Sequence, residues 1–337
     1  MEQTTSLTPQ LFFETVTAFQ RSAAIKSAVE LDVFTKIAEG NKTIETIAQA
    51  CDASTRGIRI LCDVLTVMGF LNKKNNQYDL TDVSAAFLNR HSPAFVGNAV
   101  DFLMSPMQQR GFDDLTAAVR HGGSIVREED SLAPDSPMWV KFARGMMPMM
   151  MPQAQMMAQR LGFEPDRKLK VLDIAAGHGI FGISVAQKYP NAKVYAVDWS
   201  NVLEVAKENA EKFGVAESHH LIEGSAFDVE YGNDYDVVLV TNFLHHFDKP
   251  TNESLLRKIR QSLTDDGKVL TLEFVPNDDR VSPPMEATFS LVMLAGTPAG
   301  DAYTFAELKE MFENAGFSRN EHIVLAPMPQ HLIVSQK

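Results

Sequence analysis

Two adjacent histidines, His245 and His246, follow the apolar run Tyr235–Val240 and precede Asp248. Histidine changes its charge near neutral pH, so it is the side chain best suited to take a proton from a weakly acidic hydroxyl. If the strand predicted over the apolar run extends through the pair, the two side chains point to opposite faces, and only one of them serves a given site. A second doublet, His219–His220, opens another predicted strand without a surrounding motif, so adjacency alone is not the signal. The position of the first doublet at the end of a strand in an α/β sheet, where ligands bind, favours a catalytic role.

A glycine-rich turn lies in the segment Val171–Gly182, where Gly177, Gly179 and Gly182 have the spacing G-x-G-x-x-G. Glycine after a strand lets the backbone approach a ligand closely, and the N-terminus of the following helix favours an anionic group. Asp198 ends the next predicted strand. A carboxylate there accepts two hydrogen bonds from ribose hydroxyls, in a dinucleotide site or in a nucleoside site.

Asp173, inside the end of the first predicted strand, distinguishes these two kinds of site. A nicotinamide dehydrogenase places a pyrophosphate near this turn, where a carboxylate would repel it. A carboxylate is compatible with a ligand that carries an amino group and a sulfonium, which describes S-adenosylmethionine (SAM). The alternative role of Asp173 is structural, as an acceptor for backbone N–H groups of the loop.

From Lys168 onward, short apolar runs alternate with helical segments, a pattern typical of an open parallel sheet with helices on both faces. The end of the chain, from Gly316, reads as two strands around a turn that contains proline. The predicted strands of the alternating part are 169–175, 192–198, 219–224, 235–241 and 267–275, and the predicted helices are about 180–189, 201–213, 251–263 and 304–315.

Residues 11–88 have helical periodicity followed by two short extended pieces around the polar turn KKNNQ, which is the pattern of a winged helix. Thr43, with Thr46 following, is the predicted N-cap of the second helix, and Ser54 or Thr55 is that of the third.

A DNA-binding winged helix should carry basic residues on its third helix and wing. Here the third helix has Arg56 and Arg59 near its start and then turns apolar, and residues 1–100 hold 9 Lys and Arg against 10 Asp and Glu. The N-terminal region is therefore predicted to be a packing or dimerisation domain.

The middle of the chain, residues 93–165, is predicted to be helical, and seven of the sixteen methionines fall between Met146 and Met157. Methionine fills irregular core gaps, but it also makes a pliable apolar wall for a flat ligand, and both readings stay open. Pro148 and Pro152 should kink or end helices here and open room for a pocket. Further breaks are expected at Pro106, Gly122–Gly123, Pro134 and Pro137.

The composition sets outer limits on the function. The chain of 337 residues is 45% hydrophobic and 22% charged, as in a soluble globular protein, and its formal net charge is −12. The acidic balance argues against nucleic acid or an anionic membrane as the main partner. Two cysteines are too few for a disulfide framework, and neither a secretory signal nor a membrane span is recognisable, so a cytoplasmic location is expected.

Five segments, VLDIAAGHG, VYAVDWS, IEGSAF, YDVVLVTNFLHHF and DGKVLTLEFV, fall in the order and spacing of a class I SAM-dependent methyltransferase. With the winged-helix start, the whole chain resembles the plant-type O-methyltransferase family, including its bacterial small-molecule members. The resemblance implies an α/β fold: a Rossmann-like sheet with a C-terminal antiparallel hairpin, preceded by an all-α winged-helix domain through which two subunits interlock. The implied domains are a dimerisation domain (1–100), a helical connector that contributes to the substrate pocket (101–165) and a SAM-binding domain (166–337).

The resemblance also assigns cofactor-binding residues. Ser225 stands where the family usually has an acid near the adenine, so its bond to the adenine should be weaker or differently made. The implied set comprises Asp173, Ala175, Gly177 and Gly179 around the methionine part of SAM, Asp198 and Trp199 at the ribose, Gly224, Ser225, Ala226, Phe227 and Phe247 near the adenine, and Thr241 and Asn242 beside them.

For catalysis, the resemblance implies that His245 is the base and that Glu273 orients it. His246 takes the position where the family usually has an acid. The second glutamate that commonly flanks the base aligns near Ala302, so this chain lacks it, and Asp301 next door is not assumed to replace it.

The sequence thus predicts a metal-independent O-methyltransferase that transfers a methyl group from SAM to a hydroxyl of a small aromatic or polyketide-like acceptor, leaving S-adenosylhomocysteine. Alternatives are a C- or N-methyltransferase of the same fold and a SAM-sensing winged-helix regulator. The enzyme is expected to be a homodimer without nucleic-acid or membrane partners. Phe142, Met146 and Met150 are the predicted acceptor-binding residues, and adjacent histidines cannot easily chelate one metal ion.

Overall fold

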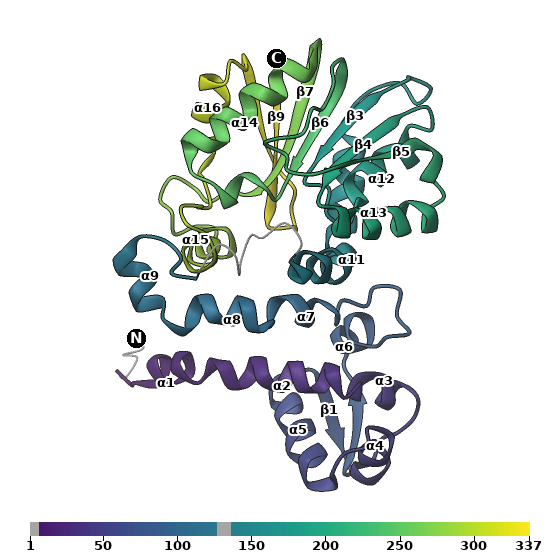
Figure 1. Cartoon of the computed structure of the whole chain (residues 1–337). Coiled ribbons are helices and arrows are strands. Elements are labelled where there is room, and N and C mark those ends of the chain that lie inside the picture. Colours follow the sequence, from purple (N-terminus) through teal and green to yellow (C-terminus); the bar gives the residue numbers. More distant parts are fainter. Residues whose placement is uncertain (1–6, 127–135) are drawn as a thin grey trace, which may run out of the picture. The chain divides into compact units, whose positions relative to one another are not determined.

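The computed structural model describes residues 7–126 and 136–337. The chain divides into two compact units, residues 1–104 and 105–337, which are coloured from purple to yellow along the sequence in Figure 1.

The first unit is a winged helix, as predicted. The N-cap predictions are confirmed, because the side chains of Thr43 and Ser54 accept hydrogen bonds from Thr46 N and Gly57 N. The described elements are α1 (Gln10–Val16), α2 (Ala18–Glu30), α3 (Val33–Ala38), α4 (Ile44–Ala50), α5 (Thr55–Val67), β1 (Leu71–Lys74), β2 (Gln77–Leu80), α6 (Asp82–Phe87) and α7 (Ala99–Leu103).

The wing is a hairpin in which Asn75 and Asn76 both have positive φ angles, 51° and 59°. Asparagine tolerates this left-handed conformation, which a two-residue type I′ turn requires at both positions. Phe34, Ile47 and Tyr78 are buried in the core between the helices and the hairpin.

The second unit contains a seven-stranded sheet in the order β5-β4-β3-β6-β7-β9-β8. The first five of these strands run parallel, and the last two form the antiparallel hairpin that ends the chain. Their bounds are β3 (Lys170–Ile174), β4 (Lys193–Asp198), β5 (His219–Glu223), β6 (Tyr235–Thr241), β7 (Leu263–Phe274), β8 (Arg319–Val324) and β9 (Gln330–Gln336). The strand order reverses between β3 and β6, so the carboxyl ends of these two strands border the crevice where α/β sheets bind ligands.

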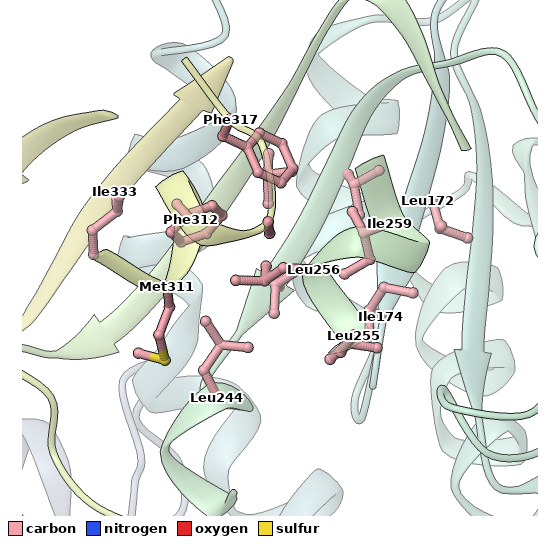
Figure 2. Packing of buried hydrophobic residues seen from close by; sticks show 14 of the residues in the cluster. Leu172, Ile174, Leu244, Leu255, Leu256, Ile259, Met311, Phe312, Phe317 and Ile333 are labelled. Carbon is pink, nitrogen blue, oxygen red and sulfur yellow. The ribbon is translucent and has the colours of Figure 1, made fainter. Parts of the chain in front are cut away.

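Helices cover both faces of this sheet (Figure 1). Four of them confirm the predicted ranges: α12 (Ile180–Lys188), α13 (Ser200–Lys212), α14 (Lys249–Ser262) and α16 (Phe305–Asn314). Figure 2 shows Leu255, Ile259 and Phe312 of α14 and α16 in one apolar cluster with Leu172 and Ile174 of β3. Because side chains alternate along a strand, Asp173 between them points to the opposite face, toward α12.

The helical middle of the chain comprises α8 (Pro106–Asp113), α9 (Leu115–His121) and α11 (Pro137–Gln159). Pro106 and Pro137 start helices, and Gly122 with φ 84° ends one, as expected, whereas Pro134 lies outside the described residues. Pro148 and Pro152 were predicted to kink or end helices; neither ends one, because α11 continues through both. A buried face that includes Met146, Met150, Ala154 and Met157 packs along α12 and α13, and tertiary packing of this kind outweighs the lost backbone hydrogen bonds.

One helix of the second unit, α15 (Pro284–Gly296), was not predicted from the sequence. Within the described ranges, no helix has the length and apolar character needed to cross a bilayer.

Candidate active site

The histidine pair does not lie on a strand. β6 ends at Thr241, Asn242 turns the backbone with a left-handed φ of 52°, and Leu244–His246 form a single 3₁₀ turn. The prediction that the two histidines point to opposite faces of an extended strand is therefore wrong, and their ring centroids lie 4.3 Å apart. The tight turn, rather than strand alternation, gives each ring its own environment.

His245 is bound by Glu273, the residue predicted to orient it. The Nδ1 atom of His245 lies 2.5 Å from Glu273 Oε2, and both side chains are buried. The other carboxylate oxygen, Oε1, accepts hydrogen bonds from Phe243 N at 2.9 Å and Leu244 N at 2.8 Å. Since an ionised carboxylate only accepts hydrogen bonds, this pairing places the imidazole proton on Nδ1 and leaves Nε2 free to accept a proton.

Two further side chains hold the turn that carries His245. Asn252 on α14 is fully buried and donates to the carbonyls of Leu244 at 2.8 Å and Phe247 at 3.2 Å. The Tyr303 hydroxyl donates to the Phe247 carbonyl at 2.6 Å. The backbone on both sides of the base is thus fixed by buried hydrogen bonds, although nothing in the sequence motif indicated Asn252 or Tyr303.

His246 lies among aromatic rings, with centroid distances of 5.8 Å to Trp139, 6.5 Å to Phe243 and 6.2 Å to Phe247. Burial lowers the pKa of His246 well below its usual value, so its ring stays neutral at physiological pH. A neutral ring that lacks a carboxylate partner is poorly placed to hold the positive charge that a general base acquires.

Asp173 faces the glycine turn from β3. Its Oδ2 accepts a hydrogen bond from Gly182 N at 3.1 Å, so part of the structural role considered for it is present. A Cβ on Gly182 would lie 2.9 Å from this oxygen, which explains why glycine is needed there. Complete burial raises the pKa of Asp173 to about 7, because little around the carboxylate stabilises its charge.

Asp198, at the end of β4, accepts hydrogen bonds from Gly177 N at 2.8 Å and from Trp199 N at 2.7 Å. Burial raises its pKa to about 6. Gly177 and Gly179 have φ angles of 57° and 72°, and the structure brings this turn against Asp198.

Ala175 also has a positive φ, 52°, on the same turn. This conformation is costly for alanine, and strained backbone of this kind gathers at functional sites.

The segment predicted to frame an adenine follows β5. Gly224 has φ 130°, and Ser225 Oγ accepts a hydrogen bond from Phe227 N at 3.1 Å. The ring of Phe227 lies 4.9 Å from that of Phe247, and Phe243 lies 5.0 Å from Phe247, so the predicted pair is part of a three-ring cluster.

Lys258 on α14, which the sequence did not single out, holds the loop that follows Ser225. Its ammonium donates to the carbonyl oxygens of Ala226, Phe227 and Val229 at 3.3, 2.7 and 2.7 Å. Three charge-assisted hydrogen bonds from one side chain fix the backbone of this loop.

Helix α11 supplies the predicted acceptor-binding residues. Met146 and Met150 are buried, and the Met150 sulfur accepts from Asn242 Nδ2 at 3.9 Å and from Gln330 Nε2 at 3.8 Å. Phe142 lies against the glycine turn. A Cβ added to Gly177 would be 3.6 Å from the ring of Phe142. Thr241, also predicted for the cofactor, is buried at the end of β6.

Asp301 does not replace the missing second glutamate near Ala302. Asp301 points to Arg280, with which it forms an ion pair at 3.1 Å, and Ala302 is fully buried. Gly300 lies directly against the base, since a Cβ there would be 2.1 Å from the His245 carbonyl oxygen. Phe289 of α15 covers the ring of His245 at 4.9 Å.

The site contains buried polar atoms that lack a hydrogen-bond partner among the described residues. Buried polar atoms usually have a partner, so these atoms leave acceptor and donor capacity that a polar ligand can use. They are Asp173 Oδ1, Asn242 Oδ1, His246 Nδ1 and Trp139 Nε1. SAM fits these groups, because its ammonium and sulfonium suit the carboxylates and its ribose suits Asp198.

Comparisons with known proteins agree with this geometry. Residues 113–318 match the model of the O-methyltransferase domain, and residues 13–90 match that of the O-methyltransferase dimerisation domain. The chain is 56% identical in sequence to a protein from Nostoc punctiforme whose crystal structure is described as that of an O-methyltransferase. The two structures superpose with a TM-score of 0.94, over 99% of this chain and 100% of the other.

More distant relatives extend the likeness. The 3-hydroxy-5-methyl-1-naphthoate 3-O-methyltransferase of Streptomyces sahachiroi is 25% identical over 92% of this chain and 90% of its own length. Human N-acetylserotonin methyltransferase, solved in complex with SAM, has the same fold, with a TM-score of 0.86, 21% identity and coverage of 100% and 99% of the two chains. The family-model matches cover most of the sequence, and the chain therefore belongs to the plant-type O-methyltransferase family and is a SAM-dependent methyltransferase.

Proposed function

We propose that the enzyme methylates a hydroxyl group of a small aromatic acceptor, with His245 as the general base and without a metal ion. The observation that carries this proposal is the buried pair of His245 and Glu273, with Nδ1 and Oε2 2.5 Å apart. A phenol is a poor nucleophile while protonated, and a neutral imidazole can remove its proton as the methyl group is transferred.

When bound, SAM supplies an electrophilic methyl group on its sulfonium. Asp173 and Asp198 would hold the charged amino acid part and the ribose. Phe227 and Phe247, whose rings meet edge to face with centroids 4.9 Å apart, would form an aromatic wall beside the adenine. Positioning of the acceptor hydroxyl by α11 and the turn of His245 supplies much of the acceleration, because an in-line displacement needs little beyond alignment.

Glu273 does two things in this mechanism. It fixes the tautomer that leaves Nε2 as the proton acceptor, and its negative charge stabilises the imidazolium that forms. The ring of Phe289, which lies against His245, suits an aromatic acceptor, and Met146 and Met150 of α11 would add a pliable apolar surface. The naphthoate acceptor named for the Streptomyces sahachiroi relative has this chemistry.

The proposal is tested with His245→Gln, which keeps a polar side chain of similar reach but cannot take the proton. Methyl transfer to a naphthol should fall by about 100-fold or more, in line with the usual contribution of a general base. Binding of S-adenosylhomocysteine, measured by calorimetry, should change little. Retained activity would remove His245 as the base, and inhibition of the wild type by a chelator would contradict a metal-free reaction.

A carbon or nitrogen acceptor is the second candidate, because Ala302 stands where a second glutamate would flank the base. Locating the new methyl group in the product by NMR separates it from O-methylation.

We also propose that the enzyme is a homodimer formed through its first unit, where the dimerisation model matches. Helix α1 and the start of α2 expose large apolar side chains, a surface that a lone soluble subunit rarely leaves in water. They are Leu11, Phe12, Phe13, Val16 and Phe19, with exposed fractions between 54% and 77%.

A further inference from the structure

A second group of titratable side chains lies beside the base. The His331 Nε2 atom is 3.8 Å from Glu286 Oε1, and His331 Nδ1 is 2.8 Å from His322 Nε2. Glu286 and His331 are only 6% and 5% exposed. In the described part of the chain, His, Cys, Asp and Glu side chains form no group of three able to hold a metal ion, so the cluster calls for another explanation.

Two observations connect this group to His245. The register of β7 and β9 pairs Glu273 with His331, so these two side chains leave the same face of the sheet. On α15, Phe289 lies one turn after Glu286 and on the same side of the helix, and its ring contacts His245 at 4.9 Å. Glu286 therefore lies one helical turn from Phe289, the residue whose ring contacts His245.

Glu286 is under-satisfied for a buried carboxylate. Glu273 receives three N–H groups within 2.9 Å, whereas the described residues offer Glu286 a single contact, at a distance too long for a hydrogen bond. A buried charge without donors is costly. Glu286 is 6% exposed, and its oxygens are not among the fully buried atoms that lack a partner.

The two histidines form the polar surroundings of this carboxylate. Burial lowers the pKa of both His322 and His331, so both rings are neutral near pH 7. If His322 Nε2–H donates to His331 Nδ1, the remaining proton of His331 is on Nε2 and faces Glu286. The ring of Phe305 stacks on His322 at 4.7 Å and holds this end in place.

We propose that Glu286, beside His331, is a subsite that accepts a hydrogen bond from a second hydroxyl of the aromatic acceptor, remote from the hydroxyl that is methylated. A carboxylate oxygen accepts a hydrogen bond, so the subsite favours a hydroxyl over a methyl ether at the same position. Phe289, stacked on Phe274 at 4.1 Å, forms the aromatic surface between the base and this subsite. The inference rests on the proposed function, since it assumes a phenolic acceptor at His245.

The test uses 2,6- and 2,7-dihydroxynaphthalene and the monomethyl ether of each as acceptors. Each ether keeps one hydroxyl for methylation but lacks the second donor. The wild-type kcat/KM for at least one diol should exceed that for its ether by roughly 10- to 100-fold, the usual effect of leaving a buried polar group unpaired. Glu286→Leu should remove this preference by lowering the rate on the diol alone, and Glu286→Gln, which keeps an acceptor oxygen, should retain part of it.

The control variant is Glu310→Leu, because Glu310 is an exposed glutamate on α16 whose side chain is 63% accessible. It should leave both rates unchanged. A preference that is absent in the wild type, or an equal loss on diol and ether in Glu286→Leu, would overturn the subsite and indicate a structural role. No methyl transfer to any of the four naphthols by the wild-type enzyme would overturn the proposed phenolic acceptor and the subsite with it.

Discussion

At the scale of single residues, Asp173 and Asp198, the two carboxylates of the proposed cofactor site, differ from Glu273, the carboxylate of the proposed catalytic pair. Glu273 is held by three N–H groups, but Asp173 receives only Gly182 N and keeps one oxygen without a partner. Burial raises the pKa of Asp173 to about 7 and that of Asp198 to about 6. Both values lie above those of the unfolded chain, so the free folded protein takes up protons as the pH falls below 7.

This arrangement predicts a pH-dependent affinity for the cofactor. The ammonium of S-adenosylhomocysteine favours ionised Asp173, so binding should release protons near pH 6.5 and weaken by up to about tenfold per pH unit below 7. Calorimetry in two buffers of different ionisation enthalpy measures the released protons. Asp173→Asn should bind more weakly and lose most of the pH dependence, and equal affinity of the wild type at pH 5.5 and pH 8 would contradict the prediction.

The raised pKa values of Asp173 and Asp198 also affect stability, with a pH dependence opposite to that of cofactor binding. Because folding raises these pKa values, the folded chain binds more protons than the unfolded chain between about pH 4 and pH 7, and the contribution of Asp173 and Asp198 to the free energy of unfolding falls as the pH rises through this window. Bound S-adenosylhomocysteine should reverse this trend in thermal unfolding curves.

At the scale of elements, the turn Leu244–His246 is held by loops and helices that arrive from distant parts of the sequence. Gly300 is the tightest of these contacts, since a Cβ would be 2.1 Å from the His245 carbonyl oxygen. Gly300→Ala should therefore displace the turn and lower kcat by at least about tenfold, because small misplacements of a base are expensive in rate.

Gly296→Ala is the matched control for Gly300→Ala. Gly296 ends α15, and a Cβ there meets no atom within 4 Å. This variant should keep wild-type kcat, and an equal loss in both variants would mean that the segment tolerates no change in general.

Lys258 has a similar role for the loop after Ser225. Lys258→Met should remove three charge-assisted hydrogen bonds to Ala226, Phe227 and Val229, with a loss of about 1–3 kcal/mol in the free energy of unfolding. Affinity for S-adenosylhomocysteine should fall by roughly tenfold. Arg257→Met, on the same helix with a half-exposed side chain, removes a surface ion pair and should alter neither quantity by much.

At the scale of the whole molecule, the proposed active site and the proposed dimer interface lie in different units of the chain. The proposed catalytic pair, the glycine turn and the proposed acceptor subsite all lie in residues 105–337, whereas the exposed apolar helix lies in residues 1–104. Each unit has its own core, and the first unit also exposes an apolar surface on α1 and α2.

The homodimer is tested by Phe12→Asp combined with Phe13→Asp, at positions that are 63% and 58% exposed. Sedimentation equilibrium should give twice the subunit mass for the wild type and the subunit mass for the variant, because two charges would be buried at the interface. Val281→Asp, at a 73% exposed position of the second unit, is the control and should remain dimeric. A monomeric wild type would contradict the proposal.

Much of the fold was predictable because its signals are local. The side chains of Thr43 and Ser54 cap helices next to them in the sequence, and β6 spans the whole apolar run Tyr235–Thr241. The order of the glycine turn, Asp198 and His245 along alternating strands likewise needs no tertiary information, because parallel strands bring their carboxyl ends to one edge. These patterns sufficed for the family, the fold class and the cofactor.

Other features were decided by tertiary structure. The left-handed backbone at Asn242 ended β6 before the histidines, which no periodicity revealed. α11 runs through Pro148 because packing along the helix outweighs a local penalty, and the buried pair of Glu286 and His331 joins segments 45 residues apart. Contacts of this kind depend on how whole elements pack. The types and spacing of side chains along the chain do not determine the distance between two atoms that come together only through packing.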